Sequence, residues 1–233
     1  MIPALRLDNV SYRYEDGTVA LRDVSFEIAQ GESVGIIGHN GSGKTTLFLA
    51  MLGILDDTDG ISVNGTPVTR ETLNEVRKMV GYVFADPRDQ LFMSRVIDDV
   101  AFGPLNRGVE SEEAIERAVA ALSSVGLDGY ADRVPYHLSS GEMRRAAIAT
   151  VLAMDPDIII MDEPSSGLDP RAKRDLADVI QSLDATRLIA SHDLDFIRSC
   201  TGRVLVLNRG SVIASGFTAD ILNNNELLLA NGL

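Results

Sequence analysis

The chain has 233 residues, of which 45% are hydrophobic, which suits one large α/β domain or a core with a smaller subdomain. Its formal net charge of −13 argues against a broad nucleic-acid-binding surface, which would need clustered lysines and arginines. An acidic surface does not exclude nucleotide binding, because a phosphate site needs only local positive charge. It also does not exclude docking beneath a membrane protein, because the cytoplasmic faces of such proteins tend to be basic.

No apolar run approaches the ~18 to 20 residues that cross a bilayer, and the N-terminus lacks the basic and apolar regions of a signal peptide. The single cysteine, Cys200, excludes an internal disulfide and fits a reducing cytosol. We expect its side chain to have a packing role.

The N-terminal region predicts two half-buried strands, because apolar and polar side chains alternate over Leu5–Val10 and over Val24–Ile28. The turn signal Glu15-Asp16-Gly17 separates the two runs. Tyr12 and Tyr14 share a face if the first strand continues there, and an aromatic ring ahead of a phosphate loop could stack on a nucleotide base. Spacing alone leaves that role and a structural cap on the sheet equally open.

A glycine-rich stretch lies between a buried strand predicted over Ser33–Ile37 and a helical run over Thr46–Leu52, and it fits G-x-x-x-x-G-K-[ST]. In this order, consecutive backbone N–H groups and the positive end of the helix point at a bound anion. A Gly/Ser-rich loop that arose by chance is therefore the weaker interpretation. Lys44 can reach the β- and γ-phosphates, and the Thr45 hydroxyl can join a Mg²⁺ shell. The residues expected to hold the nucleotide here are Gly38, Asn40, Gly41, Ser42, Gly43, Lys44, Thr45 and Thr46.

The next segment predicts a strand and turn over Ile61–Gly65, a helix over Leu73–Lys78 and a buried strand over Met79–Phe84. A loop follows, because Pro87 disfavours helix at the residue before it.

The clearest amphipathic helix is predicted over Glu112–Val125, with Ser111 as its N-cap and Gly126 at its end. The apolar positions expected on its buried face are Ile115, Ala118, Val119, Leu122 and Val125.

Another helix is predicted to open near Ser139 and to run to about Ala153. Ser139 is the expected N-cap, while Ser140 and Gly141 expose backbone N–H groups at the positive end of the helix, which is a second candidate anion site. An ordinary capped helix would explain this motif if it stood alone.

Two carboxylates follow the buried strand predicted over Ile158–Met161, at the strand end where ligands sit in open α/β sheets. Asp162 is placed to hold Mg²⁺ directly or through water, and Glu163 could polarise an attacking water. A solvated loop is the alternative, which the phosphate loop makes less favourable. A further strand over Thr186–Ala190 leads to His192, which could contact the γ-phosphate, although a lone histidine is usually structural.

In this order the motifs resemble those of the ATP-binding-cassette (ABC) ATPases, and the resemblance covers nearly the whole chain. The matches are Gly38–Thr45 with the Walker A loop, Leu138–Glu142 with the LSGGQ signature, Ile158–Glu163 with Walker B, Ser166–Asp169 with the D-loop and His192 with the switch histidine. Tyr14 falls where the family places its base-stacking aromatic, and the resemblance adds Asp169 to the nucleotide site.

The resemblance implies an α/β fold with a P-loop NTPase core, an antiparallel β subdomain and an inserted helical subdomain. We expect one ATPase domain over residues 1–233, with the core and β subdomain in about 1–87 and 151–233 and the helical subdomain in about 88–150. It also implies ATP and Mg²⁺ as cofactors, and composite sites in a head-to-tail dimer, for which a homodimer is favoured.

Within the family, Val80–Phe92 and Asp99–Asn106 resemble the energy-coupling-factor ATPases, which drive uptake of vitamins and of cobalt or nickel ions. In that type a short helix, here around Gln90, faces a transmembrane coupling subunit. The chain stops soon after the core, as in the biotin-transporter ATPase, so biotin is the favoured substrate. The implied partners are a second ATPase subunit, the coupling subunit and a substrate-binding membrane subunit, with no nucleic acid, at the cytoplasmic face of the cell membrane.

Three positions depart from the family pattern. Ala85 replaces the Q-loop glutamine and supplies neither an oxygen nor a hydrogen bond to Mg²⁺ or the lytic water, and Gln90 is not assumed to substitute for it. Ser140 replaces a signature glycine, and Glu142 replaces its glutamine with a carboxylate that could weaken phosphate binding. We still expect hydrolysis, because the catalytic set Lys44, Asp162, Glu163 and His192 is present.

Two alternatives stay open on the sequence. One is an ATP-gated switch in which Ala85 has weakened hydrolysis. The other is a soluble, non-transport cassette protein acting on DNA or ribosomes, which would normally show a coiled-coil insertion, a second cassette or a basic face.

Overall fold

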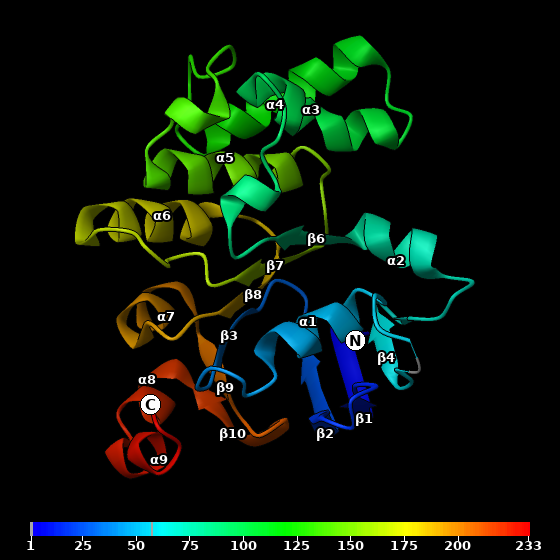
Figure 1. The fold of residues 1–233 in the computed structure, drawn as a ribbon, viewed down its shortest axis with the longest axis vertical. Coiled ribbons are helices and arrows are strands. Elements are labelled where there is room, and N and C mark those ends of the chain that lie inside the picture. Colours follow the sequence, from blue (N-terminus) through cyan, green and yellow to red (C-terminus); the bar gives the residue numbers. More distant parts are fainter. Residues whose placement is uncertain (1, 57) are drawn as a thin grey trace.

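The computed structural model describes residues 2–56 and 58–233, which fold around two β-sheets (Figure 1). The smaller sheet is antiparallel and has the order β2-β1-β4-β5. The larger sheet has the order β10-β9-β3-β8-β7-β6, and its described pairs are parallel except for β9 with β10. The strands are β1 (Leu5–Arg13), β2 (Val19–Ile28), β3 (Ser33–Ile37), β4 (Ile61–Val63), β5 (Thr66–Pro67), β6 (Val80–Val83), β7 (Ile158–Asp162), β8 (Thr186–Ala190), β9 (Arg203–Asn208) and β10 (Ser211–Phe217).

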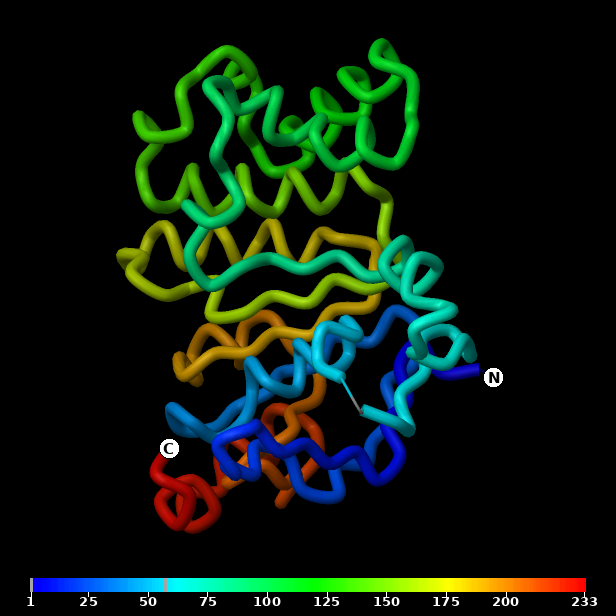
Figure 2. The backbone as a smooth tube through the Cα atoms, turned by 45° about the vertical axis from the view of Figure 1, so that its right-hand side comes forward, coloured from blue at the N-terminus to red at the C-terminus, as the bar shows by residue number. Residues whose placement is uncertain are grey.

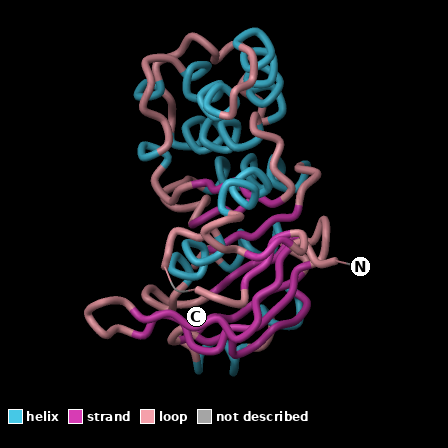
Figure 3. The backbone as a smooth tube through the Cα atoms, turned by 90° about the vertical axis from the view of Figure 1, so that its right-hand side faces the viewer, coloured by secondary structure: helices cyan, strands magenta, loops and turns pink. Residues whose placement is uncertain are grey.

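The helices α3, α4 and α5 gather at one end of the molecule, and most strands, with α8 and α9, lie toward the other (Figure 1 and Figure 3). At the helical end α5 packs against both α3 and α4, and it also contacts β6 and α6. None of the described helices is long and apolar enough to span a bilayer. The helices are α1 (Lys44–Met51), α2 (Leu73–Met79), α3 (Val96–Asn106), α4 (Ser111–Ser124), α5 (Ser140–Leu152), α6 (Pro170–Ser182), α7 (Leu194–Cys200), α8 (Thr218–Leu222) and α9 (Asn225–Ala230), with 3₁₀ turns at Pro87–Asp89 and Pro135–His137.

The large sheet is buried on both faces, which is why its central strands are apolar runs rather than alternating ones. Successive side chains of a strand point to opposite faces. Ile37 and Ile159 therefore join the core that includes α3 to α7, while their neighbours Ile36 and Ile158 join the core under α1 and the small sheet. The large sheet thus separates two hydrophobic cores, one on each of its faces. The candidate site lies at the ends of its strands.

The strand predicted before the phosphate loop is confirmed as β3, and the helix after it starts at Lys44, two residues earlier than predicted. β1 ends at Arg13, so Tyr14 lies just beyond the strand. The rings of Tyr12 and Tyr14 meet edge to face with centroids 5.0 Å apart. Tyr12 packs on the core of the small sheet, which leaves Tyr14 to face the loop.

The amphipathic helix α4 is confirmed, but its predicted cap and part of its predicted face are wrong. Glu110 takes the N-cap position and Ser111 is already helical. Ile115 and Val119 are 40% and 52% exposed, because the helix packs through small residues that allow close approach. The side chains it buries are Ala114, Ala118, Ala121 and Leu122.

Candidate active site

The phosphate loop connects the end of β3 to the start of α1. Gly41 and Gly43 have φ angles of +79° and +108°, a region that favours glycine. Lys44 is 7% exposed, and its Nζ donates to the Gly38 carbonyl oxygen at 2.7 Å and to the His39 carbonyl oxygen at 3.3 Å. The ammonium group is therefore held inside the loop before any ligand enters.

Gly38 is the tightest point of this loop, since a Cβ there would collide with the Leu207 carbonyl oxygen and with Ser42 Oγ. We expect Gly38→Ala to distort the loop and to weaken ATP binding by at least about fivefold, because overpacking costs about 1–3 kcal/mol. Gly202→Ala is the matched control, since no atom lies within 4 Å of a Cβ at Gly202. Isothermal titration with ATP checks both variants, and equal affinities for the two would contradict this account of Gly38.

Asp162 ends β7 directly beside the loop. Its Oδ2 accepts hydrogen bonds from the Thr45 hydroxyl at 2.8 Å and from the Tyr82 hydroxyl at 3.2 Å. Burial raises the pKa of this carboxyl, and the hydrogen bonds from Thr45 and Tyr82 oppose the rise. A hydroxyl and a carboxylate oxygen form the hard donor set that Mg²⁺ prefers, so Thr45 and Asp162 fit that ion.

Glu163 turns away from its neighbour, because its backbone has a φ of +47° and its N–H donates to the Ala190 carbonyl oxygen at 2.8 Å. Pairing of β7 with β8 brings this residue next to His192, whose Nδ1 lies 2.8 Å from Glu163 Oε2. Glu163 Oε1 is 4.0 Å from Lys44 Nζ. The structure thus brings the three predicted catalytic residues together.

Tyr14 belongs to the same site, since its hydroxyl shares a hydrogen bond of 3.0 Å with Thr46 Oγ1. A cavity of about 360 Å³ lies here, and it includes most of the residues predicted to hold the nucleotide. Its lining residues include Tyr14, Asn40, Gly41, Gly43, Lys44, Thr45, Thr46, Asp162 and Glu163. Ser42 lies in the loop with its hydroxyl buried and without a hydrogen-bond partner among the described residues.

The predicted second anion site is built on the start of α5. Ser139 is the N-cap, as predicted, and it forms a reciprocal capping box with Glu142. Glu142 Oε2 accepts from the Ser139 N–H at 2.7 Å and from the Ser139 hydroxyl at 2.8 Å, while Oε1 accepts from the Tyr130 hydroxyl at 2.6 Å. Both carboxylate oxygens are therefore engaged, and the side chain that replaces the signature glutamine stabilises the helix start.

These contacts of Glu142 predict that the free energy of unfolding depends on pH in a way that can be tested. The Tyr130 hydrogen bond, followed by the Ser139 N–H, lowers the pKa of Glu142 to about 2. A lowered pKa stabilises the fold above the ordinary value of 4.5, and this contribution is lost as the pH falls toward 2.

We therefore expect the wild type to be more stable than Glu142→Gln by about 1 to 2 kcal/mol at neutral pH, a magnitude reduced for solvent screening. The difference should shrink as the pH falls. Urea unfolding at about pH 5 and about pH 3 measures it. Tyr130→Phe should show a smaller effect of the same sign, whereas parallel pH curves for wild type and Glu142→Gln would contradict the account.

The signature segment lies away from the phosphate loop of the same chain. A separate cavity of about 400 Å³ is lined by Ser139, Ser140 and Gly141, and also by Asp169. It shares no lining residue with the cavity at the phosphate loop, among the described residues. Asp169 itself caps α6, accepting from the backbone N–H groups of Arg171 and Ala172. One chain therefore brings its predicted nucleotide-binding residues to two places.

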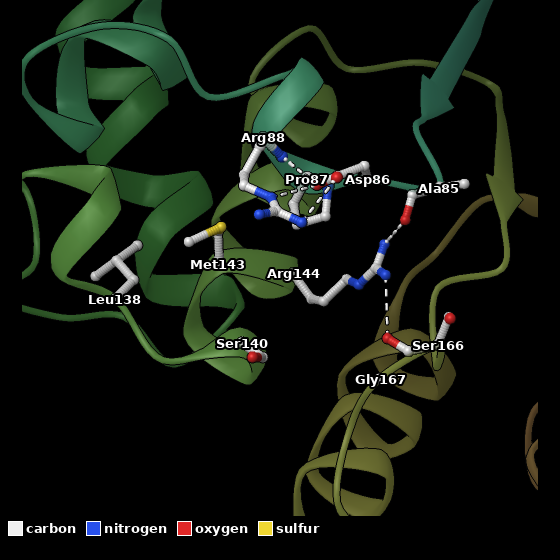
Figure 4. Close-up of a pocket in the computed structure, with 10 residues that line it drawn as sticks. All are labelled: Ala85, Asp86, Pro87, Arg88, Leu138, Ser140, Met143, Arg144, Ser166 and Gly167. Atoms are coloured by element: carbon white, nitrogen blue, oxygen red, sulfur yellow. Dashed lines mark hydrogen bonds and ion pairs between the residues drawn. The ribbon is translucent and has the colours of Figure 1, made fainter.

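Arg144 is a residue that sequence reasoning missed. It is 7% exposed, and its guanidinium donates to the carbonyl oxygen of Phe84. Figure 4 shows that it also donates to the carbonyl oxygens of Ala85 and, at 3.1 Å, of Ser166. It thus ties the start of α5 to the segments that follow β6 and β7. The available signal was the pair Arg144-Arg145, which stands directly before the apolar run that begins at Ala146.

Gln90 does not take the place of the missing glutamine at residue 85. Its Oε1 accepts from the Phe84 N–H at 3.1 Å, and its Nε2 donates to the Ala147 carbonyl oxygen at 2.8 Å and to Thr150 Oγ1 at 2.5 Å. The side chain is therefore used to fasten the end of β6 to α5.

A phosphate loop follows the carboxyl end of the inner strand β3, a buried carboxylate ends the nearby strand β7, and a glutamate pairs with a histidine beside them. Together these features define a P-loop nucleoside triphosphatase. The ABC transporter family model matches residues 21–166 of the chain. The chain belongs to the ABC transporter ATPases, of the energy-coupling-factor type, and it is an ATP-hydrolysing enzyme.

Two curated relatives illustrate this membership. A putative ABC transporter ATP-binding protein of Geobacter sulfurreducens is 51% identical over 216 residues, which cover 92% of this chain and 87% of that protein. The energy-coupling factor transporter ATP-binding protein EcfA of Carboxydothermus hydrogenoformans is 42% identical over 234 residues, covering 99% and 86%.

Solved structures agree on the fold. CbiO1 of Clostridium perfringens, described as part of the ABC transporter complex cbiONQ, has a TM-score of 0.88 and 34% identity, covering 99% of this chain and 94% of that one. The ATP-binding cassette MJ0796, in a dimeric post-hydrolysis state with ADP and Pi, has a TM-score of 0.81 and 26% identity, covering 92% and 98%. The expected P-loop NTPase fold of the ABC type is confirmed.

Proposed function

We propose that the chain is the ATP-hydrolysing subunit of an energy-coupling-factor importer for a vitamin, or for cobalt or nickel ions, and that two copies pair head to tail. It would act as a peripheral protein on the cytoplasmic face of the membrane, joined to a coupling subunit and a substrate-binding subunit. The EcfA relatives and the CbiO1 neighbour support a membrane-coupled role.

In this proposal the phosphate loop holds the triphosphate through its N–H groups, the positive end of α1 and the Lys44 ammonium group. Thr45 and Asp162 would hold Mg²⁺, which neutralises the negative charge that the phosphates carry. Tyr14 would stack on the base.

Glu163 would orient the attacking water and receive its proton as the oxygen bonds to the γ-phosphorus and ADP leaves. The hydrogen bond between Glu163 Oε2 and His192 Nδ1 at 2.8 Å would fix the carboxylate in that orientation, and His192 would sense the γ-phosphate. The catalytic gain would come from positioning and charge neutralisation, as is general for phosphoryl transfer.

The proposed head-to-tail dimer is supported by one observation, which is that the two cavities lie apart within one chain. Ser139, Ser140, Gly141 and Asp169 of one copy would close over the nucleotide held by the other. We further propose that residues of about 88–150 form a helical subdomain that moves on closure and passes the movement to the membrane partner.

Purification of the tagged chain from membranes of its own cells tests this function. We expect two integral membrane subunits to accompany it, and mass spectrometry of the extracted complex should find a retained vitamin or a cobalt or nickel ion. Recovery with ribosomes or DNA, in place of membrane subunits, would overturn the transport proposal.

A further inference from the structure

His39 lies in the phosphate loop but has no part in the mechanism above, although both of its ring nitrogens are engaged. Nδ1 lies 2.7 Å from the Asn40 carbonyl oxygen, and Nε2 lies 3.1 Å from Asn208 Oδ1. The His39 carbonyl oxygen also accepts the hydrogen bond from Lys44. The ring therefore links the middle of the loop to Asn208, the last residue of β9.

The hydrogen bonds continue from Asn208 to the C-terminal helix. Asn208 Nδ2 donates to Asn231 Oδ1 at 2.6 Å, and Asn231 Nδ2 donates to the Leu227 carbonyl oxygen at 2.7 Å. Asn231 caps the C-terminal end of α9. In both Figure 1 and Figure 2 the C-terminus lies beside the loop that leads from β3 into α1.

Backbone carbonyl groups close this chain of bonds at both ends, and a carbonyl oxygen can only accept. Asn231 must therefore turn its amide nitrogen to Leu227 and its oxygen to Asn208. Asn208 must in turn present its own oxygen to His39. Rotation of either amide would set two like groups against each other.

The end of β9 also supports the loop directly. The Gly210 N–H, just beyond β9, donates to the Ser42 carbonyl oxygen at 2.9 Å. The Leu207 carbonyl oxygen occupies the space that a side chain on Gly38 would need. A displacement of Asn208 would therefore move backbone that touches the loop on two sides.

We propose that the C-terminal helix positions the phosphate loop through Asn231 and Asn208, so that the affinity for ATP depends on α9. Both asparagines are positioning residues, because they act on the nucleotide through His39. The proposal rests on the proposed function only in taking this loop as the ATP site.

The test measures the dissociation constant of Mg·ATP and the kcat and KM of the full chain. Asn231→Ala and Asn208→Ala should each weaken binding by about threefold to tenfold, as expected for one or two lost hydrogen bonds, with kcat at saturating ATP within about twofold of the wild type. Asn208→Ala leaves the bond between Asn231 and Leu227 intact, so it separates the link from the stability of α9. Leu229→Ala, at a site on α9 that is 77% exposed, is the control and should bind ATP like the wild type.

A double-mutant cycle separates this link from general loosening of the fold. In a His39→Ala background, Asn231→Ala should weaken binding by clearly less than it does in the wild type, because the side-chain route through His39 is cut and only the backbone contacts at the end of β9 remain. An undiminished effect there, a normal affinity in both asparagine variants, or the same loss in Leu229→Ala would overturn the proposal. Failure of the wild type to bind Mg·ATP would instead overturn the proposed function.

Discussion

Glu163→Gln is expected to lower the steady-state rate of ATP hydrolysis by about 10²- to 10⁴-fold while ATP binding is retained, the range found for loss of a general base. Glutamine has nearly the same shape and can still accept a hydrogen bond from His192, but its amide cannot take a proton from water. The Glu163 carboxylate stands 4.0 Å from Lys44 Nζ, so the change also removes a negative charge near the phosphates. Binding should therefore be unchanged or tighter.

Phosphate release measured over a range of ATP concentrations, together with nucleotide titration, checks this expectation. Glu27→Gln is a matched control, because Glu27 is a 58% exposed residue of the small sheet away from the site. His192→Ala should give an intermediate loss, since it removes the group that orients the carboxylate. Turnover by Glu163→Gln within tenfold of the wild type would remove Glu163 from the role of base.

Ala85 lacks the side chain of the Q-loop glutamine, but its backbone still links the segment after β6 to α5. Its backbone carbonyl accepts from the Arg144 guanidinium, which also bonds to Ser166, so the segment after β6 is fixed by a side chain of α5. Movement of α5 would therefore act on the segment that follows Glu163.

The parts of the site that sequence predicted well are those that local chain order determines. The phosphate loop, with its strand before and helix after, is contiguous in sequence, and so is the strand that delivers Asp162. The N-cap at Ser139 was also visible locally. Each of these features is set by residues within a few positions of one another.

The parts that sequence missed depend on contacts between distant segments. Arg144 meets Ala85 and Ser166 only because α5 packs across the ends of β6 and β7, and nothing near it in the chain specifies those partners. The two wrongly predicted positions on the buried face of α4, Ile115 and Val119, have a related cause. The apolar spacing of this helix favoured these larger side chains, whereas close packing against α3 and α5 selects the alanines.

Recovery of activity from two inactive variants is the second large effect that we expect. Lys44→Ala should weaken ATP binding by about 10- to 100-fold, since it removes charge-assisted hydrogen bonds to the phosphates. Ser140→Asp should fold normally, because Ser140 is exposed in the first turn of α5, where acids are favourable, but it places a negative charge against the partner copy's nucleotide. Each variant alone should hydrolyse almost no ATP.

Mixed in equal amounts, the two variants should recover up to about one quarter of the wild-type rate. Random pairing puts half of the chains in mixed dimers, and a head-to-tail mixed dimer carries both lesions at one site and none at the other. The matched control mixes Lys44→Ala with Glu163→Gln. Both of these lesions lie in the phosphate-loop half, so every site in their mixed dimer stays damaged and no activity should return. Equal results from the two mixtures would contradict sites shared between identical chains, because recovery requires that Ser140 acts on the nucleotide of the other copy.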